Sequence, residues 1–463
     1  MNNKPNKMRR NLLKMAGLLF SGLLPMPKSQ LYAAADNYQG PLWLFVNADG
    51  GWDPTMLCDP KGYAGSLNAA NPNRVNNYDQ SAIQQIGNIR IAPPPDTFQF
   101  GGVNYDSSLY AAQTFFAKYL QKILVINGID SGTNIHADGQ LFNLAGQLRE
   151  TYPCFGALVA GTLGSNKAMP FLTYGGYSSG ADLVTPVRMS NSALNAMYEM
   201  AYPNRSFDPR SSNSRLYLSN DIQQLIHEAS QARHIEILQQ QNLIYVRNAL
   251  EKLLDVRTKS SSLQGFVDRL LLNPTRSLSS FNGRSKAYAL YQQGRVALAS
   301  YAQGLTIGAN IMLSGFDTHA KHDELHYPLL MDLLQGVDAV IQEAEMLGLA
   351  DRLVVVMTSD FGRTPRYNPQ EGKDHWPIGS ALIMGNSIEK VVGNRVIGAT
   401  SSQFEAFGVD PFNLAPDYTG RNPNSIKLTP GHLHQSLRTL AGINALPTTS
   451  MFPLEVQELS LFS

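Results

Sequence analysis

The stretch RLVVVMTSDFGRTPRYNPQEGKDHWPIG, residues 352–379, joins an unbroken apolar run to a loop that is rich in charge, glycine and histidine. Hydrophobicity in residues 353–357 is continuous rather than alternating, as a strand covered on both faces requires. Asp360 follows the run almost at once, and the loop beyond it adds Arg363, Asp374 and His375. The stretch therefore predicts a buried strand that delivers an aspartate to a polar crevice.

Three further apolar runs lead into polar residues in the same way. The run at 42–46 leads to Asp49 and Asp53. The run at 123–126 leads to Asp130 and His136, and the run at 309–313 leads to Asp317 and His319. Between the runs, residues 107–120 and 329–347 carry apolar side chains at helical spacing. Alternation of strands and helices predicts an α/β fold, with a mainly parallel sheet covered by helices on both faces.

The carboxyl ends of parallel strands share one edge of a sheet, where functional side chains collect in a crevice. For a single aspartate at such a position, a helix cap or a turn is the more common role. Recurrence at four strand ends, with histidine beside two of them, favours a metal centre instead, because so many charges would repel one another without a cation. The candidate ligands are Asp49, Asp53, Asp317, His319, Asp360, Asp374 and His375.

Candidate catalytic groups follow the run at 123–126. Ser131 and Thr133 carry hydroxyl groups just after a strand, where a helix amino terminus could support an anionic group. Each hydroxyl could act as a nucleophile, or it could simply cap the helix that follows. His136 lies in the same segment and completes this set.

Two arginines and two histidines in and near these segments have alternative roles. Arg363 and Arg366 could hold an anionic ester group by paired hydrogen bonds. Arg363 could equally be a buried structural arginine bonded to backbone carbonyls. His322 and His326 lie at helical spacing beyond His319, which predicts a solvated or capping role for them.

The formal net charge of +1 offers no electrostatic basis for binding nucleic acid, so small molecules or neutral polymers are the expected partners. Residues 1–35 indicate a signal peptide: a basic start, a short apolar segment and an A-x-A-like cleavage site. Arg9 and Arg10 resemble the twin-arginine export motif. We therefore expect the twin-arginine export machinery as a partner, no stable membrane insertion after cleavage, and a periplasmic or secreted protein. An uncleaved amphipathic anchor is the alternative.

The remaining chain, residues 36–463, is predicted to be one domain. A Gln-, Leu- and Arg-rich interval at about 211–275 contains no strand-like run and predicts a helical insertion. The two cysteines, Cys58 and Cys154, could form a disulfide in an oxidising compartment or remain buried thiols.

With these residues in view, the chain resembles the DUF1501 family of exported bacterial proteins of unknown function, which is related to the alkaline phosphatase and sulfatase superfamily. The matching segments are residues 50–53, 133–136, 315–319, 360–364 and 372–376. The resemblance implies an alkaline-phosphatase-like three-layer α/β sandwich. It also implies metal-dependent hydrolysis of phosphate or sulfate esters, with a small molecule or a polymer as the substrate.

The resemblance also implies roles for single residues. Asp49 or Asp53 is similar to the first metal aspartate of those enzymes, Asp317 and His319 to the second cluster, and His375 to the late histidine ligand. Phe361 follows Asp360 where the enzymes have a histidine. This difference favours a single divalent ion (zinc, calcium, magnesium or manganese), an oxygen-rich site for calcium, magnesium or manganese, or a decayed site, rather than a full two-zinc centre. The competing hypothesis is a secreted binding or assembly protein that keeps the fold without catalysis.

Overall fold

The structure is a computed structural model, and it describes residues 38–65, 74–94, 109–202, 204–205, 215–243, 246–247, 260–272, 276–385 and 391–462. The predicted signal peptide, residues 1–35, lies outside the described residues. Within the described ranges, every helix is too short or too polar to cross a membrane.

Eight strands form one sheet in the order β12-β4-β11-β8-β1-β7-β5-β6. Their bounds are β1 Leu42–Asp49, β4 Ile123–Asp130, β5 Phe171–Thr173, β6 Val187–Arg188, β7 Gly308–Ser314, β8 Leu353–Ser359, β11 Ile378–Gly385 and β12 Arg395–Ile397. Only β11 runs against its neighbours, β4 and β8; the other pairs of this sheet are parallel. The four apolar runs are β1, β4, β7 and β8, so their carboxyl ends do share one edge, as predicted.

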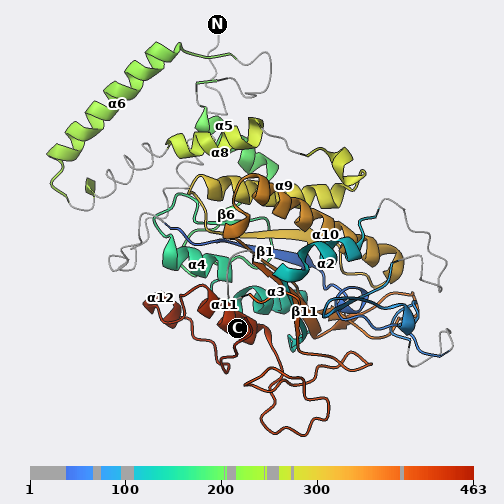
Figure 1. The fold of residues 1–463 in the computed structure, drawn as a ribbon. Helices are drawn as coiled ribbons and strands as arrows, with labels where there is room; N and C mark the ends of the chain where they lie inside the picture. The colour runs from blue at the N-terminus through green and yellow to red at the C-terminus, as the bar shows by residue number, and fades with distance from the viewer. Residues whose placement is uncertain are drawn as a thin grey trace. The chain divides into compact units, whose positions relative to one another are not determined.

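The two faces of the sheet build two separate cores. Along β1, Leu42, Leu44 and Val46 belong to one buried cluster, while Trp43 and Phe45 belong to the other. Helices supplying the first cluster are α2 Ala112–Tyr119, α8 Ser260–Leu272, α9 Ser285–Ala302 and α10 His322–Met346. Those supplying the second are α4 Phe155–Leu163 and α11 Pro430–Leu440. The alternation places helices on both sides of the sheet, which confirms the three-layer α/β sandwich (Figure 1).

The residues of β8 favour a strand that is buried on both faces. Every residue from Leu353 to Ser359 is buried, because helices cover both faces of the strand. The three consecutive valines suit a pleated strand, since their branched side chains lose little further freedom there. Burying each of them contributes about 1.5–3 kcal/mol.

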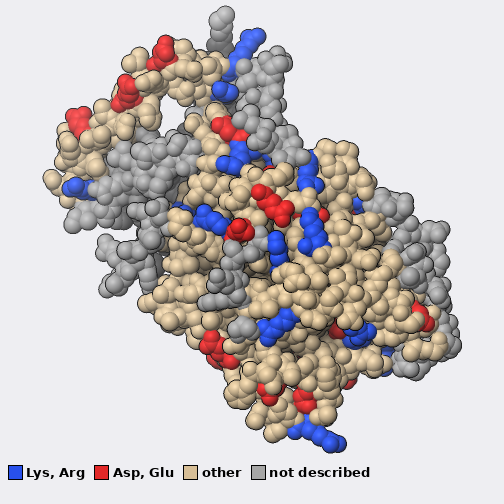
Figure 2. Space-filling view, in the orientation of Figure 1, with Lys and Arg blue, Asp and Glu red and all other residues tan. Residues whose placement is uncertain are grey.

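The described chain also contains the α-helices α3 His136–Ala145, α5 Asn191–Ala201, α6 Asn220–Gln240 and α12 Pro447–Ser450. Helices α6 and α8 fall in the interval predicted as a helical insertion. Helix α8 adds Phe266 and Val267 to the first core, whereas α6 has no buried residue. Cys58 and Cys154 are both buried free thiols, so the disulfide alternative does not apply. The face seen in Figure 2 carries basic and acidic side chains interspersed, without a large area of one sign among the described residues.

Candidate metal centre

The loop after β8 turns back over the carboxyl edge of the sheet. Beyond Asp360 the chain forms β9 Gly362–Arg363, which pairs antiparallel with β10 His375–Trp376. In that pairing His375 lies opposite Arg363, and β10 leads directly into β11. The short β9–β10 ladder therefore brings the end of the loop back to the carboxyl end of β8, where the loop began.

Three imidazole rings point their Nε2 atoms at one carboxylate, that of Asp317. Its Oδ1 lies 2.9 Å from Nε2 of His319, 3.1 Å from Nε2 of His375 and 3.5 Å from Nε2 of His136. The Nε2 atoms of His319 and His375 are themselves 3.0 Å apart. We call His136, Asp317, His319 and His375 the candidate metal centre; ligand atoms of His136, Asp317 and His375 all lie within 4.8 Å of one another.

A second set of contacts fixes the proton on each ring. The Nδ1 atoms donate to oxygens that can only accept: His136 to Asp360 Oδ2 at 2.8 Å, His319 to Asp374 Oδ1 at 2.7 Å and His375 to the carbonyl of Asn134 at 2.7 Å. In a neutral ring the other nitrogen then carries a lone pair. This pattern, with a carboxylate or carbonyl behind each histidine, is the usual support of metal-ligating histidines.

One nitrogen of the centre makes no hydrogen bond. Nε2 of His136 is buried and has no hydrogen bond to any described residue. An orphaned, buried lone pair is costly unless something positive meets it. The donor set therefore fits a divalent cation, which would satisfy this nitrogen together with the neighbouring lone pairs.

The charges around the centre favour an ionised Asp317. Burial would raise the pKa of this carboxyl group, but the hydrogen bond from the Arg363 guanidinium and its positive charge hold it below the usual range. The pKa of His136 is raised, mainly by its hydrogen bond to Asp360, against the effect of burial. The hydrogen bond from His319 lowers the pKa of Asp374. Carboxylates thus stand both at the centre and behind two of its rings.

Phe361 packs under the centre. Its ring lies 4.9 Å from that of His136 and 4.6 Å from that of His375, measured between centroids. Gly51 has a φ of +85°, and a Cβ atom there would come within 2.8 Å of the Phe361 ring. The glycine turn after β1 thus leaves room for an aromatic wall beneath two of the three imidazoles.

The family described as "Protein of unknown function (DUF1501)" matches residues 43–413. The chain belongs to the DUF1501 family. Comparison with curated proteins gave no match.

Several solved structures are similar to this DUF1501 protein at low sequence identity. PsFucS1 sulfatase from Pseudoalteromonas sp. is 10% identical, with a TM-score of 0.37 over 96% of this chain and 73% of the other. Ps i-CgsB in complex with k-i-k-neocarrahexaose is 8% identical, with a TM-score of 0.38 over 92% and 76%. Alkaline phosphatase from the Antarctic bacterium TAB5 is 8% identical, with a TM-score of 0.31 over 78% and 95%.

Arg363 of the DUF1501 protein is fully buried and is held by backbone carbonyls. Its guanidinium donates to the carbonyls of Gly50, Gly51 and Lys373, and it also bonds Asp317 Oδ1 at 2.8 Å. Burial lowers the pKa of this arginine. Of the two alternatives for Arg363, these contacts support the structural one, in which the guanidinium orients Asp317.

Asp53 was expected among the ligands, yet it lies in a different buried cluster. Its Oδ2 accepts from Lys373 Nζ at 2.6 Å and lies 3.1 Å from His322 Nε2, while its Oδ1 accepts from Thr55. Although burial opposes ionisation, Lys373 and His322 hold the pKa of Asp53 well below its usual range. An ammonium group already neutralises this carboxylate, so we do not include Asp53 in the centre.

The solvated role predicted for His322 and His326 is wrong, because both rings are completely buried. They stack 4.3 Å apart on α10, one turn from each other. Burial lowers the pKa of both. Their spacing of four residues correctly placed the two side chains on one helix face, but it does not distinguish a buried face from a solvated one.

Three further predicted site residues bond to groups outside the candidate metal centre. Asp49 accepts from Gln140 at 2.6 Å, and Ser131 donates to the carbonyl of Pro377 at 2.9 Å. Thr133 accepts from the backbone N–H of Ile135 at 3.1 Å, a turn contact of the kind that the capping alternative describes. Among the described hydrogen bonds, none joins either hydroxyl to the candidate metal centre.

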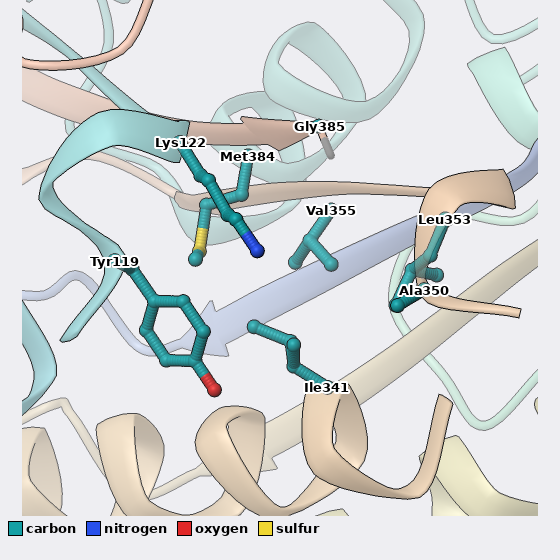
Figure 3. Close-up of a pocket in the computed structure, with 8 residues that line it drawn as sticks. All are labelled: Tyr119, Lys122, Ile341, Ala350, Leu353, Val355, Met384 and Gly385. Atoms are coloured by element: carbon teal, nitrogen blue, oxygen red, sulfur yellow. The ribbon is translucent and has the colours of Figure 1, made fainter. Parts of the chain in front are cut away.

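An open cleft lies beside the centre. Its volume is about 380 Å³, and its lining includes Arg366, Asn368, Asp374, Trp376 and Glu405. Asp374 also supports His319, so the cleft and the centre share this residue. The pocket in Figure 3 is a different feature: it measures about 20 Å³, and Leu353 places it at the amino end of β8, away from the centre.

Proposed function

We propose that this DUF1501 protein is an exported, metal-dependent hydrolase of phosphate or sulfate esters with a single-ion centre. The observation that carries the proposal is the convergence of three histidine Nε2 atoms on Asp317, each ring having an oxygen acceptor at Nδ1. His136, His319 and His375 would hold the ion through Nε2, and Asp317 through its carboxylate. Export rests on the twin-arginine motif in residues 1–35.

The donor set favours zinc among the four ions considered. Three imidazole nitrogens and one carboxylate suit Zn²⁺, whereas Ca²⁺ and Mg²⁺ prefer oxygen ligands throughout. Manganese accepts imidazole less readily than zinc does, following the general order of divalent affinities. When bound, the ion would supply Lewis-acid chemistry: it would make water a better nucleophile near neutral pH and polarise an ester oxygen.

The protein's own groups would hold and orient the reactants. Asp360, Asp374 and the Asn134 carbonyl keep the imidazole protons on Nδ1, so that Nε2 stays free. Arg363 holds Asp317 in place. The side chain of Arg366 is exposed in the adjoining cleft, where it could pair with the anionic group of an ester.

Water is the proposed nucleophile, because Ser131 and Thr133 are engaged elsewhere. A hydrolase that used either hydroxyl would lose its activity on substitution to alanine. We expect Ser131→Ala and Thr133→Ala to keep at least half of the wild-type rate, whereas Asp317→Ala abolishes it.

The test is an assay of zinc-loaded protein against aryl phosphate and aryl sulfate monoesters, with these three variants in parallel. Activity that depends on Asp317 and survives both hydroxyl substitutions supports the proposal. Loss of activity in Ser131→Ala or Thr133→Ala would show that a side-chain hydroxyl, rather than water, attacks the ester. No turnover of either ester class by the zinc-loaded protein would contradict the hydrolase.

A second candidate is a secreted zinc-binding or assembly protein without catalysis. Burial of Arg363 favours it, since the arginine closest to the centre is already bonded to three carbonyls. The same assay distinguishes the hydrolase from the non-catalytic protein, because the non-catalytic protein would bind the ion stoichiometrically without ester turnover.

A further inference from the structure

We propose that Asp53, Thr318, His322 and His326 form a positioning device, a closed circuit of hydrogen bonds that sets the geometry of the candidate metal centre before an ion binds. This inference rests on the proposed metal centre. It assigns a role to four buried groups that the centre itself does not use.

The circuit can be followed from donor to acceptor. The backbone N–H of Asp53 donates to Nε2 of His326 at 2.8 Å, so that the proton of this ring stands on Nδ1. His326 Nδ1 lies 2.9 Å from the hydroxyl of Thr318 and donates to it. The hydroxyl in turn donates to Nδ1 of His322 at 2.8 Å.

The last step closes the ring. Because His322 accepts at Nδ1, its proton stands on Nε2, which lies 3.1 Å from Asp53 Oδ2. The Thr318 hydroxyl thus accepts from His326 and donates to His322, its shorter contact; the carbonyl of Phe316 lies farther away, at 3.4 Å. A polar network whose members are all satisfied is rigid in a low-dielectric interior, and the four side chains are 4% exposed or less.

Thr318 connects this circuit to the centre. It stands between the two ligands Asp317 and His319, and its side chain turns inward while theirs meet the other histidines. A hydroxyl that is held at both its donor and its acceptor side cannot rotate freely. The hydrogen bonds of Thr318 therefore fix the backbone segment that carries Asp317 and His319.

Lys373 connects the segment that carries the ligand His375 to the same circuit. Its ammonium group bonds Asp53 Oδ2 at 2.6 Å and Asn76 Oδ1 at 2.7 Å. Its backbone N–H bonds the carbonyl of Thr318 at 3.2 Å. His375 follows two residues later, so the loop segments that carry Asp317, His319 and His375 share one anchor.

The circuit does not form a second metal site. Both Nε2 atoms are occupied, one by the Asp53 backbone and one by its carboxylate, and Lys373 supplies the positive charge. This separates the buried pair of histidines from those of the centre, where Nε2 of His136 is unpaired. The two histidine clusters thus have different tasks.

Thr318→Val tests this inference, because valine keeps the shape of threonine and removes both hydrogen bonds. The matched control is Thr318→Ser, which restores the hydroxyl. Zn²⁺ is the probe, and its Kd is measured by competition with a chromogenic chelator on folded, full-length mature protein. Thermal unfolding in excess chelator is recorded for each variant, since it reports stability without the ion.

We expect Thr318→Val to bind Zn²⁺ about 10–100-fold more weakly than wild type, the loss usual for supporting residues of metal sites. Thr318→Ser should stay within about threefold of wild type. If Thr318→Val does not fold, His326→Gln breaks the circuit from α10 and is measured in the same way.

Wild-type Zn²⁺ affinity in Thr318→Val, together with reduced stability in chelator, would show a structural role only and overturn the inference. Wild-type protein that binds no Zn²⁺ would overturn the metal centre as well. The two failures are distinguishable, since the first leaves the centre intact.

Discussion

The Nε2 atoms of His319 and His375 lie 3.0 Å apart, although each ring already donates its Nδ1–H to an acceptor of its own. Two lone pairs at this distance repel each other unless a proton or a metal ion lies between or beside them. Asp317 brings a negative charge to the same point. Because of this contact between the two Nε2 atoms and Asp317, we expect a bound cation to stabilise the fold in addition to any catalytic role.

Removal of divalent ions should therefore lower the thermal stability of the protein. A ligand that binds only the folded state stabilises it by about 2.7 kcal/mol at one hundred times its Kd. We expect the Tm to fall in excess chelator and to recover when Zn²⁺ is added in excess. Calorimetry of the same sample in both conditions measures this, and His375→Ala should show little response. An equal response in that variant would place the stabilising ion elsewhere.

Asp360→Asn should weaken Zn²⁺ binding by about 10–100-fold, because the carboxylate behind His136 orients the ring and makes it more basic. Asp360 is completely buried and also accepts from the N–H of Gly50 at 3.1 Å. Its counterpart Asp374 is exposed, so solvent can replace much of its effect on His319. Asp374→Asn is thus the matched control, with an expected loss below that of Asp360→Asn. Competition with a chelator gives both values, and a larger loss for Asp374→Asn would contradict this order.

Arg363→Lys should destabilise the fold strongly. Lysine cannot reach three carbonyls and Asp317 at once, so buried acceptors would be left unpaired. Breaking a buried charged network costs about 3–5 kcal/mol. Urea unfolding of the wild type and the variant measures the difference. Arg366→Lys at the exposed position should change stability by less than about 0.5 kcal/mol. Unchanged stability in Arg363→Lys would favour the ligand-binding role for this arginine.

His434 should make stability depend on pH between about 4 and 6.5. Its ring is buried in α11, donates to the carbonyl of Asn143 at 2.9 Å and packs against Phe155. Burial lowers the pKa of His434 to about 4, below the ordinary value of 6.5. The unfolded chain therefore binds a proton first as pH falls, and the stability present above pH 6.5 is lost progressively down to pH 4.

The shift corresponds to roughly 3 kcal/mol. Unfolding of the wild type and of His434→Gln across this range measures it, since glutamine can still donate to Asn143 but does not titrate there. We expect a shallower decline in the variant. Parallel pH curves for the two proteins would assign the acid sensitivity to other groups, such as His322 and His326, whose pKa values are lowered by burial too.

The carboxyl edge of the sheet was predictable from sequence because four short, mostly apolar runs alternate with helical patterns, as strands covered on both faces do. The polar residues after them necessarily meet at that edge, which is why Asp317, His319 and His375 could be named together. Asp53 shows the limit of this reasoning. It follows β1 as expected, but a lysine 320 positions away neutralises it, and no local pattern indicates that contact. The glycine turn at Gly50 and Gly51 directs the chain between Asp317 and Phe361, and only the folded geometry shows it.

The burial of His322 and His326 was missed for a related reason. Their helix was predicted to begin at Leu329, whereas α10 already begins at His322. Histidine is intermediate between the residue types that are mostly buried and those that are mostly exposed, so residue type alone did not decide between them. Pro328 inside the helix also obscured the pattern, because proline usually marks a helix start.

Zinc content of the purified, folded mature protein tests the central claim most directly. After equilibration with Zn²⁺ and removal of loosely bound ions, elemental analysis should give one zinc per wild-type chain. Asp317→Ala and His375→Ala should give much less than one, while the neighbouring buried cluster remains intact. Wild-type protein without zinc, or full zinc content in both variants, would contradict a metal centre at His136, Asp317, His319 and His375.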